Sequence, residues 1–103
     1  MKTNEDYILR DIDGESMLIP IREASVLFNG VIHLTDTAAF IWKQVDTADC
    51  VEEIVRRLVA AYKVTEKEAR EDVYGFLGEL YRRDIVLEIP ELDSMEKRDI
   101  GNQ

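Results

Sequence analysis

A change of hydrophobic period at Thr35 is the strongest constraint on what this chain can fold into. Just before it, Ile32 and Leu34 stand two positions apart, the spacing of one face of a β-strand. After it, apolar residues recur at the i, i+3, i+4 and i+7 spacing of an amphipathic helix: Ala38, Ile41, Trp42 and Val45. Thr35 is a suitable N-cap for that helix. The sequence therefore predicts a strand that turns directly into a helix from about Asp36 to Val45.

Upstream of this corner, two β-rich runs are joined by a dipeptide that favours a tight turn. Tyr7 to Ile12 and Glu15 to Ile21 flank Asp13-Gly14. An Asp-Gly pair between such runs indicates a two-residue hairpin, because both central residues need a positive φ. The register that follows sets two apolar pairs opposite each other: Leu9 with Leu18, and Ile8 with Ile19.

A second hairpin is predicted around Asn29-Gly30, the other favoured dipeptide for a two-residue turn. Its strands would be residues 25–28 and 31–34, with Leu27 opposite Ile32 and Phe28 opposite Val31. Pro20 has no backbone N–H, so its strand is expected to lie at an edge or to end there. The two hairpins together predict a three-stranded antiparallel sheet at the N-terminal end.

Two further helices follow the corner. The second is expected from about Val51, where Asp49 and Glu52 resemble a capping box. The third and longest is expected from the capping box Thr65–Glu68 to about Arg83. Its apolar stripe comprises Ala69, Val73, Phe76, Leu77 and Leu80.

Gly75 and Gly78 interrupt this third helix. Glycine inside a helix costs roughly 1 kcal/mol relative to alanine. The two glycines therefore suggest that another segment approaches closely there; plain tolerance of glycine in the helix is the alternative.

Residues 85–89 predict a final short strand, stopped by Pro90. The expected fold class is α+β and winged-helix-like: a three-stranded antiparallel sheet, a three-helix bundle and a short C-terminal strand. Residues 1–90 are expected to form a single domain, and residues 91–103 a flexible polar tail.

The residue types needed for catalysis are scarce. The 103 residues contain one histidine, His33, and one cysteine, Cys50, so neither a His pair nor a His-Cys zinc set is present. The glycines are isolated and form no phosphate-binding loop. We expect a protein that is not an enzyme and carries no cofactor. The lone cysteine, and the lack of an apolar signal or spanning run, predict a cytoplasmic protein away from the membrane.

Charge argues against nucleic acid as a partner. The formal net charge is −9, which repels phosphate backbones. A winged-helix transcription regulator is nevertheless the alternative that the order of elements raises, with residues 66–83 as recognition helix. That segment holds four basic and five acidic residues, whereas DNA-binding helices present a basic stripe.

A family resemblance centres on the corner. Residues 33–42, His-Leu-Thr-Asp-Thr-Ala-Ala-Phe-Ile-Trp, resemble the "LNETGALIW" segment of the PqqD family, named for pyrroloquinoline quinone synthesis protein D. The similarity continues through residues 51–54, 61–64, 72–77 and 80–86, and upstream through 7–12. Thr35 and Asp36 replace the usual Asn-Glu, and Asp84 stands where members often have glycine.

The resemblance implies a function. Members of this family are RiPP recognition elements, which bind the leader segment of a ribosomally made precursor peptide. They present it to a modifying enzyme, often a radical S-adenosylmethionine (SAM) protein. The leader adds as a strand beside the third strand and against the third helix, a mode called β-augmentation.

Carried onto this chain, the resemblance implies a peptide-binding site on two elements. The strand would supply Val31, Ile32, His33 and Leu34. The helix would supply one flank: Arg70, Tyr74, Leu77, Gly78 and Tyr81. Boundary packing accounts for Tyr74 and Tyr81 equally well. An exposed strand edge also allows a homodimer.

Overall fold

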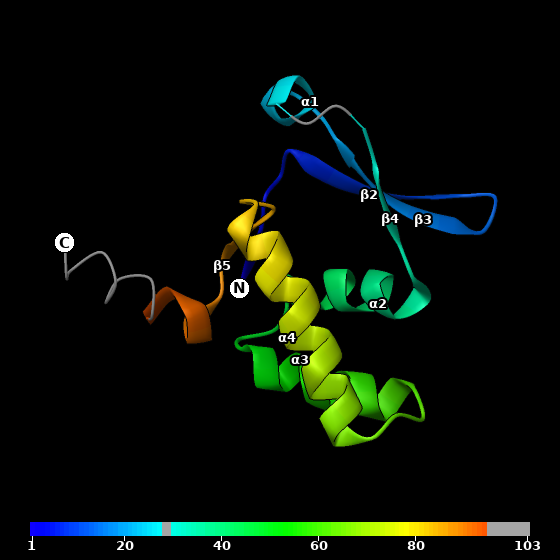
Figure 1. Cartoon of the computed structure of the whole chain (residues 1–103), viewed down its shortest axis with the longest axis vertical. Coiled ribbons are helices and arrows are strands. Elements are labelled where there is room, and N and C mark those ends of the chain that lie inside the picture. Colours follow the sequence, from blue (N-terminus) through cyan, green and yellow to red (C-terminus); the bar gives the residue numbers. More distant parts are fainter. Residues whose placement is uncertain (28–29, 95–103) are drawn as a thin grey trace.

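The computed structural model describes residues 1–27 and 30–94. Within them the chain forms an α+β fold in which a three-stranded sheet stands over a bundle of helices (Figure 1). The elements are, in order, β1 (Lys2–Thr3), β2 (Tyr7–Ile12), β3 (Glu15–Pro20), α1 (Glu23–Leu27), β4 (Ile32–Leu34), α2 (Asp36–Val45), α3 (Val51–Ala61), α4 (Glu66–Arg82) and β5 (Val86–Glu88).

The main sheet has the order β2-β3-β4 and is antiparallel throughout. Asp13 and Gly14 both have positive φ, 53° and 81°, as a two-residue hairpin requires. The predicted hairpin is confirmed, including its register: Leu9 lies opposite Leu18 and Ile8 opposite Ile19. β3 is the central strand and ends at Pro20.

The predicted second hairpin is wrong. Residues 25–27 of the segment expected as its first strand belong to the short helix α1, and β4 pairs with β3 instead, with Ile32 opposite Leu18. Arg22 turns the chain with φ of 51°, and its carbonyl oxygen accepts hydrogen bonds from the backbone N–H (3.1 Å) and hydroxyl (2.6 Å) of Ser25. These bonds close a turn that leads into α1. Phe28, the predicted partner of Val31, and Asn29 of the predicted turn lie outside the described residues.

The core lies where one face of the sheet meets the helices. Leu18 is fully buried at its top, and Ile54 and Leu58 of α3 are fully buried below. Tyr7, Leu9, Ile32 and Leu34 pack against this cluster from the same sheet face as Leu18. The opposite face is open: Ile12 on β2 keeps 48% of its surface exposed.

Two threonine caps confirm the predicted helix starts. The Thr35 hydroxyl accepts a hydrogen bond from the N–H of Ala38 (3.1 Å), and the Thr65 hydroxyl accepts one from Glu68 (3.1 Å). Because Leu34 ends β4 one residue before Thr35, the cap fixes the angle between β4 and α2.

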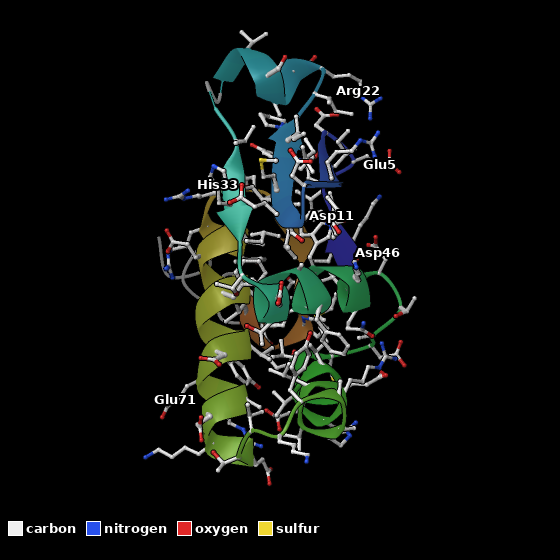
Figure 2. The ribbon with its side chains drawn as sticks, turned by 90° about the vertical axis from the view of Figure 1, so that its right-hand side faces the viewer. Glu5, Asp11, Arg22, His33, Asp46 and Glu71 are labelled. Carbon is white, nitrogen blue, oxygen red and sulfur yellow. The ribbon has the colours of Figure 1, made fainter. Side chains whose placement is uncertain are left out.

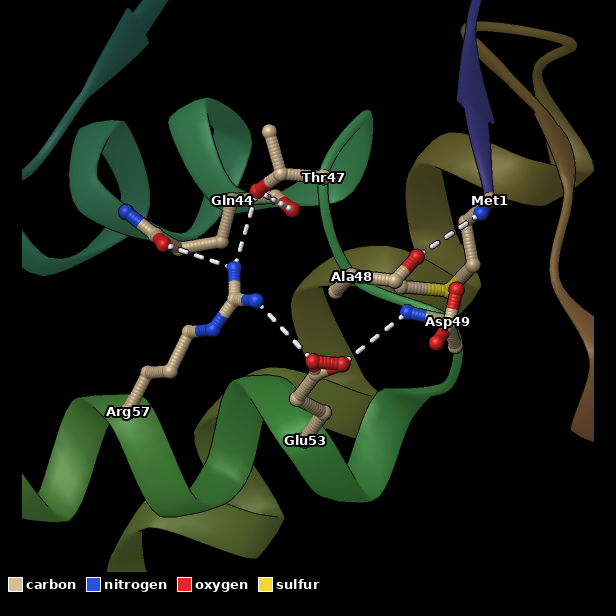
Figure 3. Close-up of polar contacts among 7 residues, drawn as sticks. All are labelled: Met1, Gln44, Thr47, Ala48, Asp49, Glu53 and Arg57. Carbon is tan, nitrogen blue, oxygen red and sulfur yellow. Dashed lines mark hydrogen bonds and ion pairs between the residues drawn. The ribbon is translucent and has the colours of Figure 1, made fainter.

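The α2–α3 corner differs from the predicted capping box. Cys50 is the N-cap and makes no side-chain cap bond, while Glu53 accepts the N–H of Asp49 (3.2 Å). Figure 3 shows the Arg57 guanidinium joining this carboxylate (2.9 Å) to Gln44 (3.0 Å). Glu52 takes no part, because it turns toward α4.

Both ends of the described chain are attached to the bundle. β1 pairs with β5, and the nitrogen of Met1 donates to the carbonyl oxygen of Ala48 (2.9 Å; Figure 3). Residues 90–94 form a helical turn in which Glu91 accepts the N–H of Val51 (2.9 Å) and Leu92 packs on the core. The first residues of the expected tail thus belong to the packed structure. The rest of that tail, from residue 95, lies outside the described residues.

The Thr35 cap provides a test of this corner. Replacing Thr35 with alanine removes the acceptor for the Ala38 N–H, so we expect a loss of about 1 kcal/mol in the free energy of unfolding. Thr35→Ser keeps the hydroxyl and should stay within a few tenths of a kcal/mol of the parent. Urea unfolding followed by circular dichroism measures both. Equal stability of the two variants would show that the hydroxyl does not cap α2.

Candidate functional site

A groove lies between β4 and α4. Its volume is ≈520 Å³. β4 and the start of α2 form one wall with Ile32, His33, Leu34, Thr35, Thr37, Ala38 and Ile41, and α4 forms the other with Asp72, Phe76, Glu79, Leu80 and Arg83. Figure 2 shows β4, with His33 labelled, along the same side of the molecule as α4.

The sheet register determines which backbone groups of β4 face this groove. A two-residue turn closes on a hydrogen-bonded pair, here Ile12 and Glu15. Hydrogen-bonded and non-bonded pairs then alternate along an antiparallel ladder. Glu15, Met17 and Ile19 therefore direct their N–H and C=O groups to β2, and Ser16 and Leu18 direct theirs to β4.

On β4, the partners of Leu18 and Ser16 are Ile32 and Leu34. The backbone N–H and C=O groups of those two residues point to β3. His33 lies between them, opposite Met17, and directs its N–H and C=O to the outer side. No strand pairs with that side among the described residues. Thr35, two residues on, gives its carbonyl oxygen to the N–H of Ala39 (2.9 Å). His33 is therefore the centre of a short open edge.

Pro20 explains why this edge is short. Continuing the β3–β4 register would set Pro20 opposite Gly30, at a position where β3 must direct an N–H toward β4. Proline has none, so pairing stops at Leu18 and β4 is only three residues long.

The groove is apolar inside and charged at its rim. Ile41 and Leu80 are buried in its floor, and Phe76 and Leu34 are half-buried on its walls. At the rim, Glu79 pairs with Arg82 and with Arg83 (3.3 Å). The hydrogen bond from Arg82, followed by the charges of both arginines, lowers the pKa of Glu79. Such a surface suits an extended chain with apolar side chains turned inward.

The strand half of the predicted site lies in this groove. Ile32, His33 and Leu34 all line it. Val31 is not among the lining residues; it directly precedes the strand and is 40% exposed.

The helix half of the predicted site lies outside this groove. Arg70 and Tyr74 face α3, not β4. Asp72 and Phe76, two residues further along, face the groove. At 3.6 residues per turn, a shift of two residues rotates a side chain by roughly 160° around the helix. The apolar stripe lies between the two flanks, and its position alone does not choose one.

The Arg70 flank forms a bond network between helices. Arg70 donates to both oxygens of Glu52 on α3 (2.7 and 3.2 Å) and to Glu66 (2.9 Å). Tyr74 donates to Glu52 as well (2.8 Å). The Arg70 bond, followed by the Tyr74 bond, lowers the pKa of Glu52 to about 2. Burial, followed by the bond to Glu52, raises the pKa of Tyr74 to about 12.

The other three predicted helix residues do not line the groove either. Leu77 is buried in the core, and Tyr81 donates to Asp93 in the helical turn after β5 (2.7 Å). A Cβ at Gly75 would meet nothing within 4 Å, and one at Gly78 would meet only Arg82 at 3.8 Å. The glycines therefore do not mark close approach of another segment.

Two kinds of site are not found in the described part of the chain. No group of three or more His, Cys, Asp or Glu side chains there could hold a metal ion. No helix there is long and apolar enough to span a bilayer.

The fold and the groove define a class: small α+β domains in which an open edge strand faces an apolar helix flank. The model of the coenzyme PQQ synthesis protein D (PqqD) family matches residues 7–86, so the chain belongs to the PqqD family, and the resemblance seen in the sequence is confirmed. No curated protein matches the sequence significantly.

Two solved structures share this fold. One, TbiB1 in complex with the TbiA(beta) leader peptide, is 23% identical with a TM-score of 0.66, over 84% of this chain and 95% of that chain. The other, lasso peptide synthetase B1 complexed with the leader peptide, is 18% identical with a TM-score of 0.66, over 84% and 96%.

The Glu52 network predicts a measurable titration. Arg70→Gln removes the main cause of the shift, so the pKa of Glu52 should rise from about 2 toward the ordinary 4.5. Carboxyl ¹³C NMR against pH measures it. Arg56→Gln is the matched control, because Arg56 contributes least to the shift. An unchanged Glu52 pKa in Arg70→Gln would refute the ion pair.

The lowered pKa of Glu52 also predicts how the stability of the protein changes with pH. A lowered folded-state pKa means that the contribution of Glu52 is present above about pH 4.5 and is lost as the pH falls toward 2. The parent should lose stability across that window, and Arg70→Gln should lose less there.

Proposed function

We propose that this protein is a non-catalytic binding module that recognises the leader segment of a ribosomally made precursor peptide by β-augmentation. The observation that carries the proposal is the open edge at His33 beside an apolar groove. A peptide strand added to β4 would bond its backbone to His33 and bury alternate side chains against Phe76 and Leu80.

The two structural neighbours support this proposal. Both were solved with a leader peptide bound, on folds that cover 84% of this chain. Membership of the PqqD family supports it further, since the resemblance to that family implies binding of a leader peptide.

Binding of the leader would bring the precursor peptide to a second protein. The module would present the peptide to a modifying enzyme, with a radical SAM maturase as the proposed partner, in the cytoplasm. A homodimer through β4 would use the same edge and would compete with the peptide.

DNA binding gains no support from the fold. The arginines of α4 and of its C-cap are paired with carboxylates: Arg70 with Glu52 and Glu66, and Arg82 and Arg83 with Glu79. A recognition helix needs such cations free to reach phosphates. Salt-dependent DNA retardation by this protein would revive that alternative.

The two flanks of α4 distinguish the proposed site from the Arg70 network. Phe76→Ala should weaken binding of a cognate leader peptide about tenfold or more, because a half-buried aromatic wall is lost. Tyr74→Phe, on the opposite flank, should leave affinity unchanged. Short peptides encoded beside the gene are titrated and followed by amide NMR, with shifts expected in residues 31–35 and 72–83. A larger loss in Tyr74→Phe than in Phe76→Ala would place the peptide on the wrong side of α4 for this proposal.

The edge itself can be tested at one atom. His33→Pro removes the outward N–H without removing a β3–β4 bond, because Met17 and His33 are a non-bonded pair. We expect peptide affinity to fall about tenfold for the lost bond and the crowded edge. His33→Ala keeps the N–H and should bind within about twofold of the parent. Circular dichroism confirms folding, and full affinity of a folded His33→Pro would exclude β-augmentation at this strand.

A further inference from the structure

The register of the sheet constrains which peptide side chains can enter the groove, given that the proposed function holds. His33 is exposed, and its neighbours Ile32 and Leu34 pack inward on the core face. The backbone groups of His33 are the ones directed to the open side. A strand added there must align one of its residues with His33.

That alignment sets the facing of the peptide. Residues aligned across neighbouring strands place their side chains on the same face of the sheet. The peptide residue aligned with His33 therefore points to the open outer face. Its two neighbours point to the face of Ile32 and Leu34, into the groove. This holds for a parallel and for an antiparallel peptide, because side chains alternate in both.

The groove has apolar side chains on both of its walls on that face. Ile32 and Leu34 form the strand side, and Phe76 and Leu80 form the helix side. Of the charged lining residues, Glu79 and Arg83 pair with each other at the rim, and Asp72 is exposed. Both inward positions are thus suited to aliphatic side chains.

We propose that the groove selects peptide segments in which two aliphatic residues are separated by exactly one residue, which can be of any type. This apolar–any–apolar spacing is the recognition element at His33. Adjacent aliphatic residues, or a pair separated by two positions, would put one side chain inward and one on the solvent face.

A set of synthetic peptides of one composition tests the spacing with the full chain. Each twelve-residue peptide carries two leucines in the same polar host sequence. The two leucines are adjacent, separated by one residue, or separated by two residues. Burying a second leucine corresponds to roughly a 10- to 100-fold gain in affinity. We expect the peptide whose leucines are separated by one residue to bind at least tenfold more tightly than the other two. Amide NMR with His33 as reporter measures the affinities.

A groove variant links the preference to the walls. Phe76→Ala should reduce the tenfold preference to a few-fold, and Tyr74→Phe should keep it in full. A preference equally large in both variants would mean that the second leucine lies outside the groove and would overturn the inference.

The two proposals fail in different ways. If peptides shift the His33 amide but all spacings bind within twofold, the spacing inference is wrong and leader binding at β4 stands. If no peptide, cognate leaders included, shifts residues 31–35, both are wrong.

Discussion

The functional geometry depends on one constraint, the alternation of backbone hydrogen bonds across β3. Asp13 and Gly14 fix its phase, because their positive φ values close the hairpin on the Ile12–Glu15 pair. Every second residue of β3 directs its backbone hydrogen bonds to β2, and the others direct theirs to β4. The same alternation therefore determines which residues of β4 bond to β3. A shift of one residue would turn Leu18 to the open face and His33 to the core side. Burial of Leu18 therefore holds the edge at His33 in place.

Much of this arrangement was predictable from local signals. The Asp-Gly turn, the Leu9–Leu18 register and the threonine caps at 35 and 65 each depend on a few neighbouring residues, and each is confirmed. The second hairpin failed for the opposite reason. Asn29-Gly30 is a strong local signal, but pairing of β4 is decided by the distant strand β3, whose Leu18 needs a partner on the core side. Tertiary pairing overrides the local preference.

Of the candidate groove, the strand wall could be predicted from the sequence, and the flank of α4 that forms the other wall could not. The reason is physical. Periodicity identifies the apolar stripe of α4, but the two flanks beside it look alike, each with an aromatic residue and charges. The contact that distinguishes them is Glu52 on α3, which takes both Arg70 and Tyr74. Its direction depends on how α3 and α4 are rotated against each other, and no spacing within either helix encodes that rotation. Glu91, which caps α3 from 40 residues away, is hidden from the sequence for the same reason.

Magnitudes show why the groove, and not the edge, would determine the affinity for the proposed peptide. A residue aligned with His33 adds about two backbone hydrogen bonds, each worth roughly 0.5–1.5 kcal/mol net. Association of two chains costs an estimated 4–15 kcal/mol in lost freedom. The open edge alone therefore captures neither stray strands nor a second copy firmly, which limits the aggregation hazard of an exposed edge. Two aliphatic side chains buried against Phe76 and Leu80 would add roughly 1.5–3 kcal/mol each. With β4 only three residues long, discrimination between peptides at the proposed site would come from side chains, which differ between peptides, and not from the backbone, which every peptide shares.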